Sequence, residues 1–223
     1  MTDNQYDRDK FVIDNLTSIP KGQNILDAGC GSQRYKKHCS NLKYLTQDFG
    51  KYDVDEKEMF NSINVESNPY NYGEINYLGN IWEINETDSF FDNILCTEVF
   101  EHIPKPNETI KEFSRVIKTG GKLILTAPFS CLRHMDPYFF YTGFSDRWYE
   151  NILKENNFKI IEIIPVGDYN RYMLSEIYRT IRRENFFISL FLLPSLLYFL
   201  FKKPNTLSIN SLCMGYHVVA IKK

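Results

Sequence analysis

The chain has 223 residues, 43% of them hydrophobic and 24% charged, with a formal net charge of −2. This profile is typical of one globular domain with a full hydrophobic core, which we expect to span residues 1–223. The near-neutral charge excludes the strong positive field that nonspecific nucleic-acid binding needs, so no nucleic-acid partner is expected. Five cysteines without paired short spacing indicate neither a disulfide framework nor a zinc site, and we expect no metal.

The N-terminal third begins with polar residues and then alternates predicted helix and strand. Its first residues lack the apolar core of a signal peptide, which indicates a cytoplasmic protein. Apolar residues at helical spacing predict a helix over residues 5–19, and a short apolar run predicts a buried strand over 24–28 with a helix after it. We further expect a strand over 42–47, a long polar loop over 51–73 and a short strand over 76–81.

The rest of the chain continues this alternation. Apolar runs predict four more strands, over residues 91–97, 122–127, 158–164 and 216–221. Asn107 is the expected N-terminal cap of a helix that Gly120 ends, with Gly121 beside it, and Ser145 is the expected cap of another helix. Strands that alternate with helices predict an α/β, Rossmann-like, doubly wound fold with a mostly parallel seven-stranded sheet.

Residues 168–210 are too many for a hairpin loop and predict a helical, hydrophobic insertion before the last strand. Within it, residues 186–201 are uncharged and flanked by Arg182-Arg183 and Lys202-Lys203. A helix of that length spans about 24 Å, which is short of a bilayer core of about 30 Å, so a membrane span is disfavoured. Two interpretations remain: a buried core or cap helix, or a helix on a membrane surface, which would place the protein at the inner membrane surface.

A glycine pair follows the first predicted strand. Ligands of such sheets bind beyond the carboxyl ends of the strands, and glycine lets the backbone turn tightly and approach a ligand closely. The free N–H groups of a following helix would suit a carboxylate. The dinucleotide fingerprint needs a third glycine where this chain has Arg34, so a nicotinamide oxidoreductase is the least favoured interpretation.

Three blocks together resemble the class I S-adenosylmethionine-dependent methyltransferases, in particular the methyltransferase type 11 group. They are residues 27–31 (DAGCG), 91–104 (FDNILCTEVFEHIP) and 115–128 (RVIKTGGKLILTAP), and the resemblance covers roughly residues 20–130. It implies S-adenosylmethionine as the cofactor and methyl transfer as the reaction. The remainder of the chain is more divergent.

The resemblance also implies roles for individual positions. An acidic residue after the second strand, here Asp48, holds the ribose hydroxyls, and Phe49 packs on the sugar or adenine. Asn80 stands where the family often has Asp, near the adenine. Asp27 is expected to face the ammonium of the methionine moiety. The full set of implied cofactor-binding residues is Asp27, Ala28, Gly29, Cys30, Gly31, Asp48, Phe49, Asn80, Ile81, Cys96, Thr97, Glu98 and His102.

Two histidines are candidate catalytic bases, because an oxygen or nitrogen acceptor gives up a proton when it is methylated. His102 follows the fourth strand, and its alternative role is to bond the adjacent loop or the cofactor. His134 lies on the loop after the fifth strand, which commonly faces the acceptor. Cys96 is expected to be a small buried residue rather than a nucleophile.

The acceptor is the part of the function that remains open. A small molecule or a glycan- or lipid-linked acceptor is expected, because the segment from His134 to Thr142 resembles enzymes that accompany glycan genes. Where those enzymes often have Arg, however, this chain has Phe140 and Tyr141. The alternative function is a cofactor-binding but catalytically silent partner or scaffold. The oligomeric state is also open.

Overall fold

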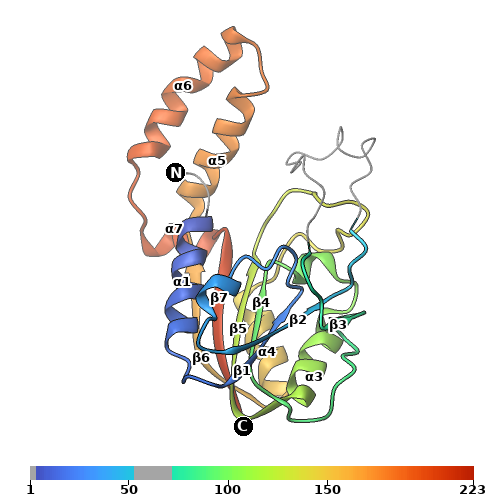
Figure 1. Cartoon of the computed structure of the whole chain (residues 1–223). Coiled ribbons are helices and arrows are strands. Elements are labelled where there is room, and N and C mark those ends of the chain that lie inside the picture. Colours follow the sequence, from blue (N-terminus) through green and yellow to red (C-terminus); the bar gives the residue numbers. More distant parts are fainter. Residues whose placement is uncertain (1–3, 53–71) are drawn as a thin grey trace.

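A seven-stranded sheet with helices on both faces forms the body of the computed structural model, which describes residues 4–52 and 72–223 (Figure 1). The strands are β1 (Asn24–Ala28), β2 (Lys43–Asp48), β3 (Tyr77–Leu78), β4 (Phe91–Thr97), β5 (Ile117–Pro128), β6 (Phe158–Val166) and β7 (Gly215–Lys222). Their order is β3-β2-β1-β4-β5-β7-β6. The strands from β3 to β5 pair in parallel, whereas β7 is antiparallel to both β5 and β6. The predicted Rossmann-like, mostly parallel sheet is therefore confirmed.

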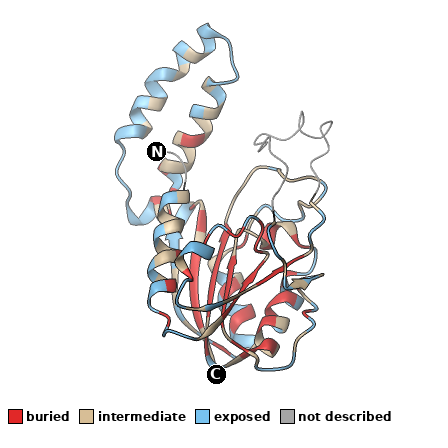
Figure 2. Cartoon of the chain, viewed as in Figure 1, coloured by how far each residue is buried: buried red, intermediate tan, exposed pale blue. Residues whose placement is uncertain are grey.

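Two layers of helices cover the sheet, and alternating strand residues face one or the other. Ile25 and Leu95 pack in the cluster under α1 (Gln5–Thr17) and the short 3-10 helix η1 (Lys36–His38). Leu26 and Ile94 belong to the larger core under η2 (Phe100–His102), α3 (Pro106–Val116) and α4 (Asp146–Glu155). Buried residues accordingly gather on the strands and on the inner helix faces (Figure 2). This core fixes the strand ends that carry the site.

The helix expected directly after the first glycine pair is absent, so that prediction was wrong. Residues 31–35 form turns, and only η1 follows before β2. Gly31 has a φ of 47° and Gln33 a φ of 57°, and right-handed helical backbone requires negative φ. The N–H groups near the glycines therefore come from a turn rather than from a helix terminus.

The boundaries of α3 also differ from the prediction. The helix starts after Lys105 with a proline in its first turn, because Pro106 has its φ fixed near the helical value and no N–H to leave unsatisfied. Asn107 lies inside the helix, where its side chain accepts a hydrogen bond from Nε1 of Trp148 at 3.1 Å.

Gly120 and Gly121 do not end α3, which stops at Val116; they lie within β5. Gly120 has a φ of 80°, and a Cβ on Gly121 would lie 2.7 Å from the carbonyl oxygen of Asp92. The two glycines therefore serve an irregular strand next to β4, where the register shifts between Phe91 and Asn93. The predicted β3 is likewise shorter than 76–81, and most of the expected 51–73 loop lies outside the described residues.

The predicted cap of α4 is confirmed, since the Ser145 side chain accepts a hydrogen bond from the backbone N–H of Trp148. The predicted helical insertion is also present between β6 and β7. It comprises α5 (Tyr169–Ile181), α6 (Phe186–Phe201) and α7 (Thr206–Ser211). Strands β1, β4 and β5 run in the same direction, and the start of β7 pairs with the end of β5. The insertion, which leads into β7, therefore projects from the carboxyl ends of these strands (Figure 1).

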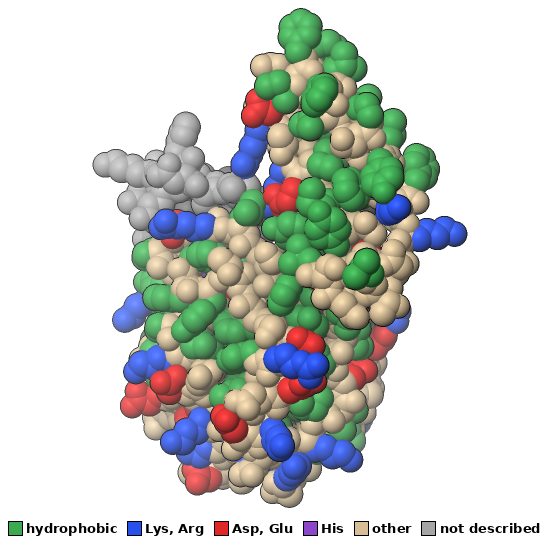
Figure 3. Space-filling view, turned by 180° about the vertical axis from the view of Figure 1, so that it is seen from behind, with side chains coloured by type: hydrophobic (Ala, Val, Ile, Leu, Met, Phe, Trp, Pro, Cys, Tyr) green, Lys and Arg blue, Asp and Glu red, His purple; other side chains and the backbone are tan. Residues whose placement is uncertain are grey.

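Helices α5 and α6 pack together as a projecting hairpin, and α6 is not part of the core. None of its residues is buried, and Phe187, Phe191 and Phe201 are each about four-fifths exposed. The interpretation of residues 186–201 as a buried core helix was therefore wrong. Seen from behind, hydrophobic side chains cover the hairpin (Figure 3). No helix of the described residues combines the length and hydropathy needed to cross a membrane.

Candidate active site

A cavity of about 240 Å³ lies at the carboxyl ends of β1, β2 and β4. On one side it is lined by Gly29 and Gly31, and on another by the aromatic side chains of Phe49, Trp82 and Tyr138. Asp48 and Asn80 supply polar groups to the wall. A mostly apolar cavity with few polar groups and bare glycine backbone fits an aromatic base on a sugar.

Gly29 is required at its position by both conformation and space. It has a φ of 69°, in the left-handed region that favours glycine. A Cβ at this position would lie 2.5 Å from Cγ2 of Val99, which itself lines the cavity. The turn after β1 therefore packs so closely on the Val99 side chain after β4 that no side chain fits between them.

The Asp48 carboxylate at the end of β2 connects the glycine turn to the next loop. Its Oδ2 accepts a hydrogen bond from the Gly31 N–H at 2.9 Å, and its Oδ1 accepts one from the Gly50 N–H at 3.0 Å. Burial nevertheless raises the pKa of the carboxyl above its usual value, against the lowering effect of these hydrogen bonds. A carboxylate has about four acceptor sites, so this group retains the capacity to accept from a pair of hydroxyls.

The structure brings some of the implied cofactor-binding residues to this cavity and not others. Those that line it are Gly29, Gly31, Asp48, Phe49, Asn80, Ile81, Glu98 and His102. Those that do not are Asp27, Ala28, Cys30, Cys96 and Thr97. Sequence reasoning did not place Trp82, Val99 or Tyr138 in the site. The sequence signal that could have indicated Trp82 and Val99 is their position shortly after the ends of β3 and β4.

Asp27 and Cys96 are held inside the protein instead. Asp27 is buried and accepts a hydrogen bond from the Tyr44 hydroxyl, and burial raises the pKa of its carboxyl to about 7. Cys96 is fully buried, and burial raises the pKa of its thiol well above the usual value. Cys96 is thus buried, as the sequence predicted.

A second and larger cavity, of about 740 Å³, lies between the sheet and the hairpin. Pro128 at the end of β5 and Met214 before β7 form part of its floor, and α5 forms a side. Glu101 and His134 line its inner end. The cavity is large enough for a second reactant beside the one in the smaller cavity.

Glu98 lines both cavities and so forms the wall they share. Its Oε1 accepts from the Thr126 hydroxyl at 2.8 Å, and its Oε2 pairs with the Arg8 guanidinium of α1 at 3.0 Å. Its backbone has a φ of 53°, which is uncommon outside glycine. A side chain fixed from two sides on strained backbone is typical of a functional position.

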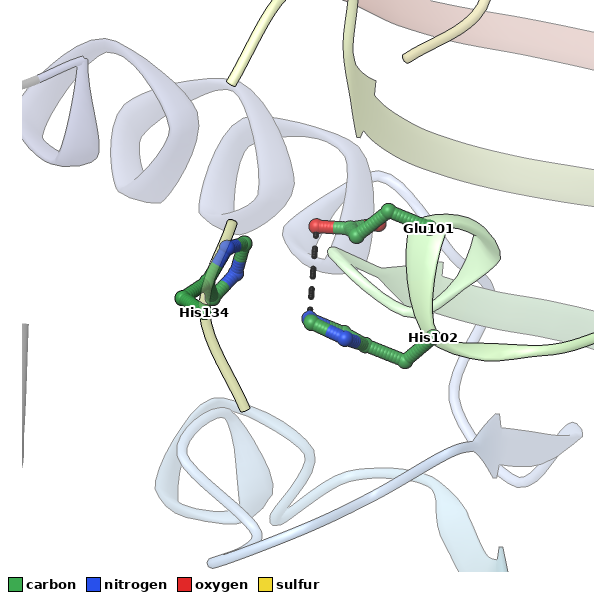
Figure 4. Close-up of side chains that lie close together, drawn as sticks. All are labelled: Glu101, His102 and His134. Atoms are coloured by element: carbon green, nitrogen blue, oxygen red, sulfur yellow. Dashed lines mark ion pairs between the residues drawn. The ribbon is translucent and has the colours of Figure 1, made fainter. Parts of the chain in front are cut away.

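Three side chains converge next to this shared wall (Figure 4). Glu101 and His102 come from η2, and His134 comes from the loop after β5. The two imidazole rings meet edge to face, with centroids 4.7 Å apart. His102 lines the smaller cavity and His134 the larger one, so the pair of candidate bases lies where the cavities meet.

Backbone carbonyls select the tautomer that each imidazole adopts in its neutral form. Nδ1 of His102 lies 2.7 Å from the Tyr138 carbonyl, and Nδ1 of His134 lies 2.8 Å from the Leu132 carbonyl. A carbonyl only accepts, so each Nδ1 donates and each Nε2 keeps a lone pair. Burial, together with the neighbouring His134, lowers the pKa of His102 to about 4, which keeps it neutral.

Glu101 is the buried acid of this cluster. Its Oε1 lies 3.7 Å from Nε2 of His102, which is too long for a hydrogen bond, and its Oε2 has no hydrogen-bond partner among the residues that the structure describes. Burial and the charge of Glu98 raise the pKa of its carboxyl well above the usual value. The ligand atoms of Glu101, His102 and His134 lie within 4.8 Å of one another, which is close enough to share a metal ion. Cysteine and histidine spacing had not indicated this grouping, since His134 joins it only through the fold.

Comparison with known proteins gives the family. A family model described as a methyltransferase domain matches residues 3–163, well over half of the chain. The chain belongs to the methyltransferase domain family. The three sequence blocks that suggested this resemblance all lie within the matched residues.

One curated relative of this methyltransferase domain is the ubiquinone biosynthesis O-methyltransferase of Coxiella burnetii. It is 29% identical over 168 residues, which cover 73% of this chain and 65% of that protein. The chain thus spans somewhat less than two thirds of the relative's length. The insertion with α6 begins beyond the residues that the family model matches.

Solved structures share the fold at low sequence identity. Geranyl diphosphate methyltransferase in complex with SAM aligns with a TM-score of 0.60 at 11% identity, over 97% of this chain and 85% of that one. The [4+2]-cyclase SpnF aligns with a TM-score of 0.58 at 15% identity, over 97% and 81%. A methyltransferase and a cyclase on one fold show that the chemistry has to be argued from the site.

Proposed function

We propose that this chain transfers a methyl group from S-adenosylmethionine to a small-molecule acceptor. The observation that carries the proposal is the meeting of two cavities at Glu98 and the His102–His134 pair. The smaller cavity has the glycine turn, the Asp48 carboxylate and the aromatic walls that suit a nucleoside. The larger one leaves room for an acceptor on the other side of the same wall.

When bound, S-adenosylmethionine would supply a methyl group on a positively charged sulfur, which is a good leaving group. The chain's contribution is to align the two reactants and to take up the acceptor's proton. His134 is the proposed base, because it lines the larger cavity and its Nε2 keeps a lone pair. The depressed pKa of His102 makes it a poor proton acceptor, and its proposed role is to pack against the cofactor side of His134.

We further propose that the acceptor is apolar or lipid-linked and that α6 lies on a membrane surface. The helix presents apolar side chains on all its exposed faces and has no charge within it. Basic residues stand at both its ends, where they suit anionic lipid headgroups. The O-methyltransferase relative supports a small-molecule acceptor.

The test is calorimetric titration of the full chain with S-adenosylmethionine and its demethylated product. Wild type is expected to bind both, and Asp48→Ala is expected to bind at least about tenfold more weakly, since hydrogen bonds to a charged group contribute about 1.5–3 kcal/mol. Asp48→Asn keeps one acceptor oxygen and serves as the matched control, with an intermediate loss. A folded wild type that binds neither ligand would refute the cofactor assignment.

The catalytic part needs a second measurement, with labelled cofactor and a lipid extract as the source of acceptor. Label transfer that depends on His134 is the expected result. A protein that binds the cofactor but transfers no methyl group to any acceptor would support the silent partner or scaffold instead.

A further inference from the structure

The larger cavity runs along one face of α5 and past its end. The residues of this stretch that line it include Tyr172, Ser175, Glu176, Arg179, Arg182 and Arg183. Intervals of three and four residues place them on one side of the helix. At 1.5 Å per residue, the distance from Tyr172 to Arg183 is about 16 Å, so the cavity suits an elongated ligand.

The inner end of this cavity contains a buried acid, and one of its two carboxyl oxygens lacks a hydrogen bond among the described residues. Glu101 is only 2% exposed, yet its Oε2 makes no hydrogen bond with any described residue. A buried polar atom without a partner is costly, and a donor group that a ligand places at this end of the cavity would offset that cost. A hydroxyl or amine donor beside Glu101 and His134 is the type of group that a methyl acceptor carries.

The outer end of the cavity is basic. Arg179 is already paired with Glu176 at 3.0 Å. Arg182 and Arg183 are exposed and pair with no carboxylate among the residues that the structure describes, and the Arg182 guanidinium lies over the Tyr178 ring, 5.9 Å from its centroid. Two neighbouring guanidinium groups are well suited to bind a phosphate or carboxylate.

Apolar surface continues from these arginines. Phe186 and Phe187 at the start of α6 are more than 70% exposed and follow Arg183 closely in the chain. A ligand that places an anionic group on the arginines can thus extend an apolar chain over α6. An acceptor with a cationic group there would be repelled.

We propose that the acceptor is an anionic amphiphile whose phosphate or carboxylate binds Arg182 and Arg183 while its methyl-accepting group lies against Glu101 and His134. The inference rests on the proposed methyl transfer and names the substrate class for it. It makes Arg182 and Arg183 specificity-determining residues. Lys202 and Lys203, at the other end of α6, do not line the cavity and are not expected to determine specificity.

The test uses dodecyl phosphate as the probe, at concentrations below its micelle formation, in calorimetric titrations of the full chain. Wild type is expected to bind it, and to bind the uncharged dodecyl maltoside more weakly. The double substitution R182Q/R183Q should weaken dodecyl phosphate binding by about tenfold or more, as the loss of charge-assisted hydrogen bonds predicts. The matched control K202Q/K203Q removes the same charge and should change the binding less than about twofold, since exposed charges outside the cavity are screened.

Inorganic phosphate and phosphatidylglycerol vesicles distinguish the sources of the anion. Competition by inorganic phosphate supports recognition of the anionic group itself. Equal weakening by both double substitutions, or equal binding of dodecyl phosphate and dodecyl maltoside, would overturn the proposal. So would an arginine effect seen with vesicles but not with dodecyl phosphate, because the arginines would then bind only a bilayer. Titration of the same samples with S-adenosylmethionine shows separately whether the cofactor assignment fails.

Discussion

At the residue scale, burial decides the protonation of His102 and His217. His217 of β7 is 5% exposed and stacks on Phe11 with ring centroids 4.7 Å apart. Burial and the nearby Arg8 lower its pKa from 6.5 to about 4. The neutral form is therefore the one that the folded protein accommodates.

This depressed pKa gives stability a definite pH dependence. Between pH values of about 6.5 and 4, the unfolded chain binds a proton at His217 that the folded chain does not, so stability falls as the pH falls through this window. We expect the free energy of unfolding of wild type to drop between about pH 7 and about pH 5 by about 2 kcal/mol more than that of His217→Gln. Urea unfolding at both pH values measures the difference.

The comparison between the two proteins cancels the other titrating groups. Asp27, whose pKa is raised to about 7, acts in the opposite direction, because the folded chain retains its proton more strongly. Above about pH 7 both proteins should follow parallel curves, since the histidine is then neutral in both states. Identical drops on acidification would contradict the assignment to His217.

At the element scale, α6 is an apolar helix whose side chains the rest of the protein does not bury. Its apolar side chains are exposed, while the α5 and α7 helices that flank it in sequence are tied down by polar contacts. Asp168 caps α5 and accepts from the Ser208 hydroxyl of α7 at 2.6 Å. The hairpin is thus anchored at its base, and α6 is presented away from the sheet.

A substitution at Phe191, which lies in α6 and is 82% exposed, tests whether α6 contacts a membrane. Phe191→Asp is expected to leave the free energy of unfolding within about 0.5 kcal/mol of wild type, because the side chain has little to lose on the folded surface. Binding to phosphatidylglycerol vesicles should fall by about tenfold, as burial of an aromatic side chain contributes about 1.5–3 kcal/mol. Vesicle flotation gives the bound fraction.

Leu78 offers the matched control for that experiment. It is 73% exposed and lies on β3, at the edge of the sheet opposite to β6, from which the hairpin follows. Leu78→Asp should retain wild-type vesicle binding. Equal losses in the two variants would mean that the added charge, and not the α6 surface, controls the binding.

At the scale of the whole molecule, the smaller cavity joins segments that are far apart in the chain. The turn after β1, the end of β2, the loop after β3 and the turn after β4 all line it, as does Tyr138. A ligand that contacts all of them binds only the folded state, so binding is linked to the stability of the entire sheet.

This linkage predicts a thermal shift. At a concentration of about 100 times Kd, S-adenosylmethionine should stabilise the protein by about 2.7 kcal/mol, which raises Tm by about 5–10 °C for a domain of this size. Differential scanning calorimetry over a series of concentrations checks the dependence. The Asp48→Ala protein should show a clearly smaller shift at the same concentration, and a Tm that does not respond in wild type would contradict the linkage.

The sequence by itself determined the order of the strands along the chain, the glycine turn after β1 and the family. These are local properties: apolar runs such as residues 91–97 form buried strands in almost any α/β sheet, and Ser145 caps α4 through a bond three residues away. Local signals were misleading where a longer-range contact decided. Gly120 and Gly121 look like a helix stop, but they serve the packing of β5 against Asp92.

Only the tertiary structure decided which residues share a site. Asp27 belongs to the family motif, yet its side chain turns to Tyr44, because strand residues alternate between the faces of the sheet. His134 reaches His102 and Glu101 through the loop after β5, and α5 places Arg182 and Arg183 on the same cavity. Contacts between distant segments depend on how the elements pack, and an apolar run such as residues 186–201 reads the same whether the fold buries it or, as here, exposes it.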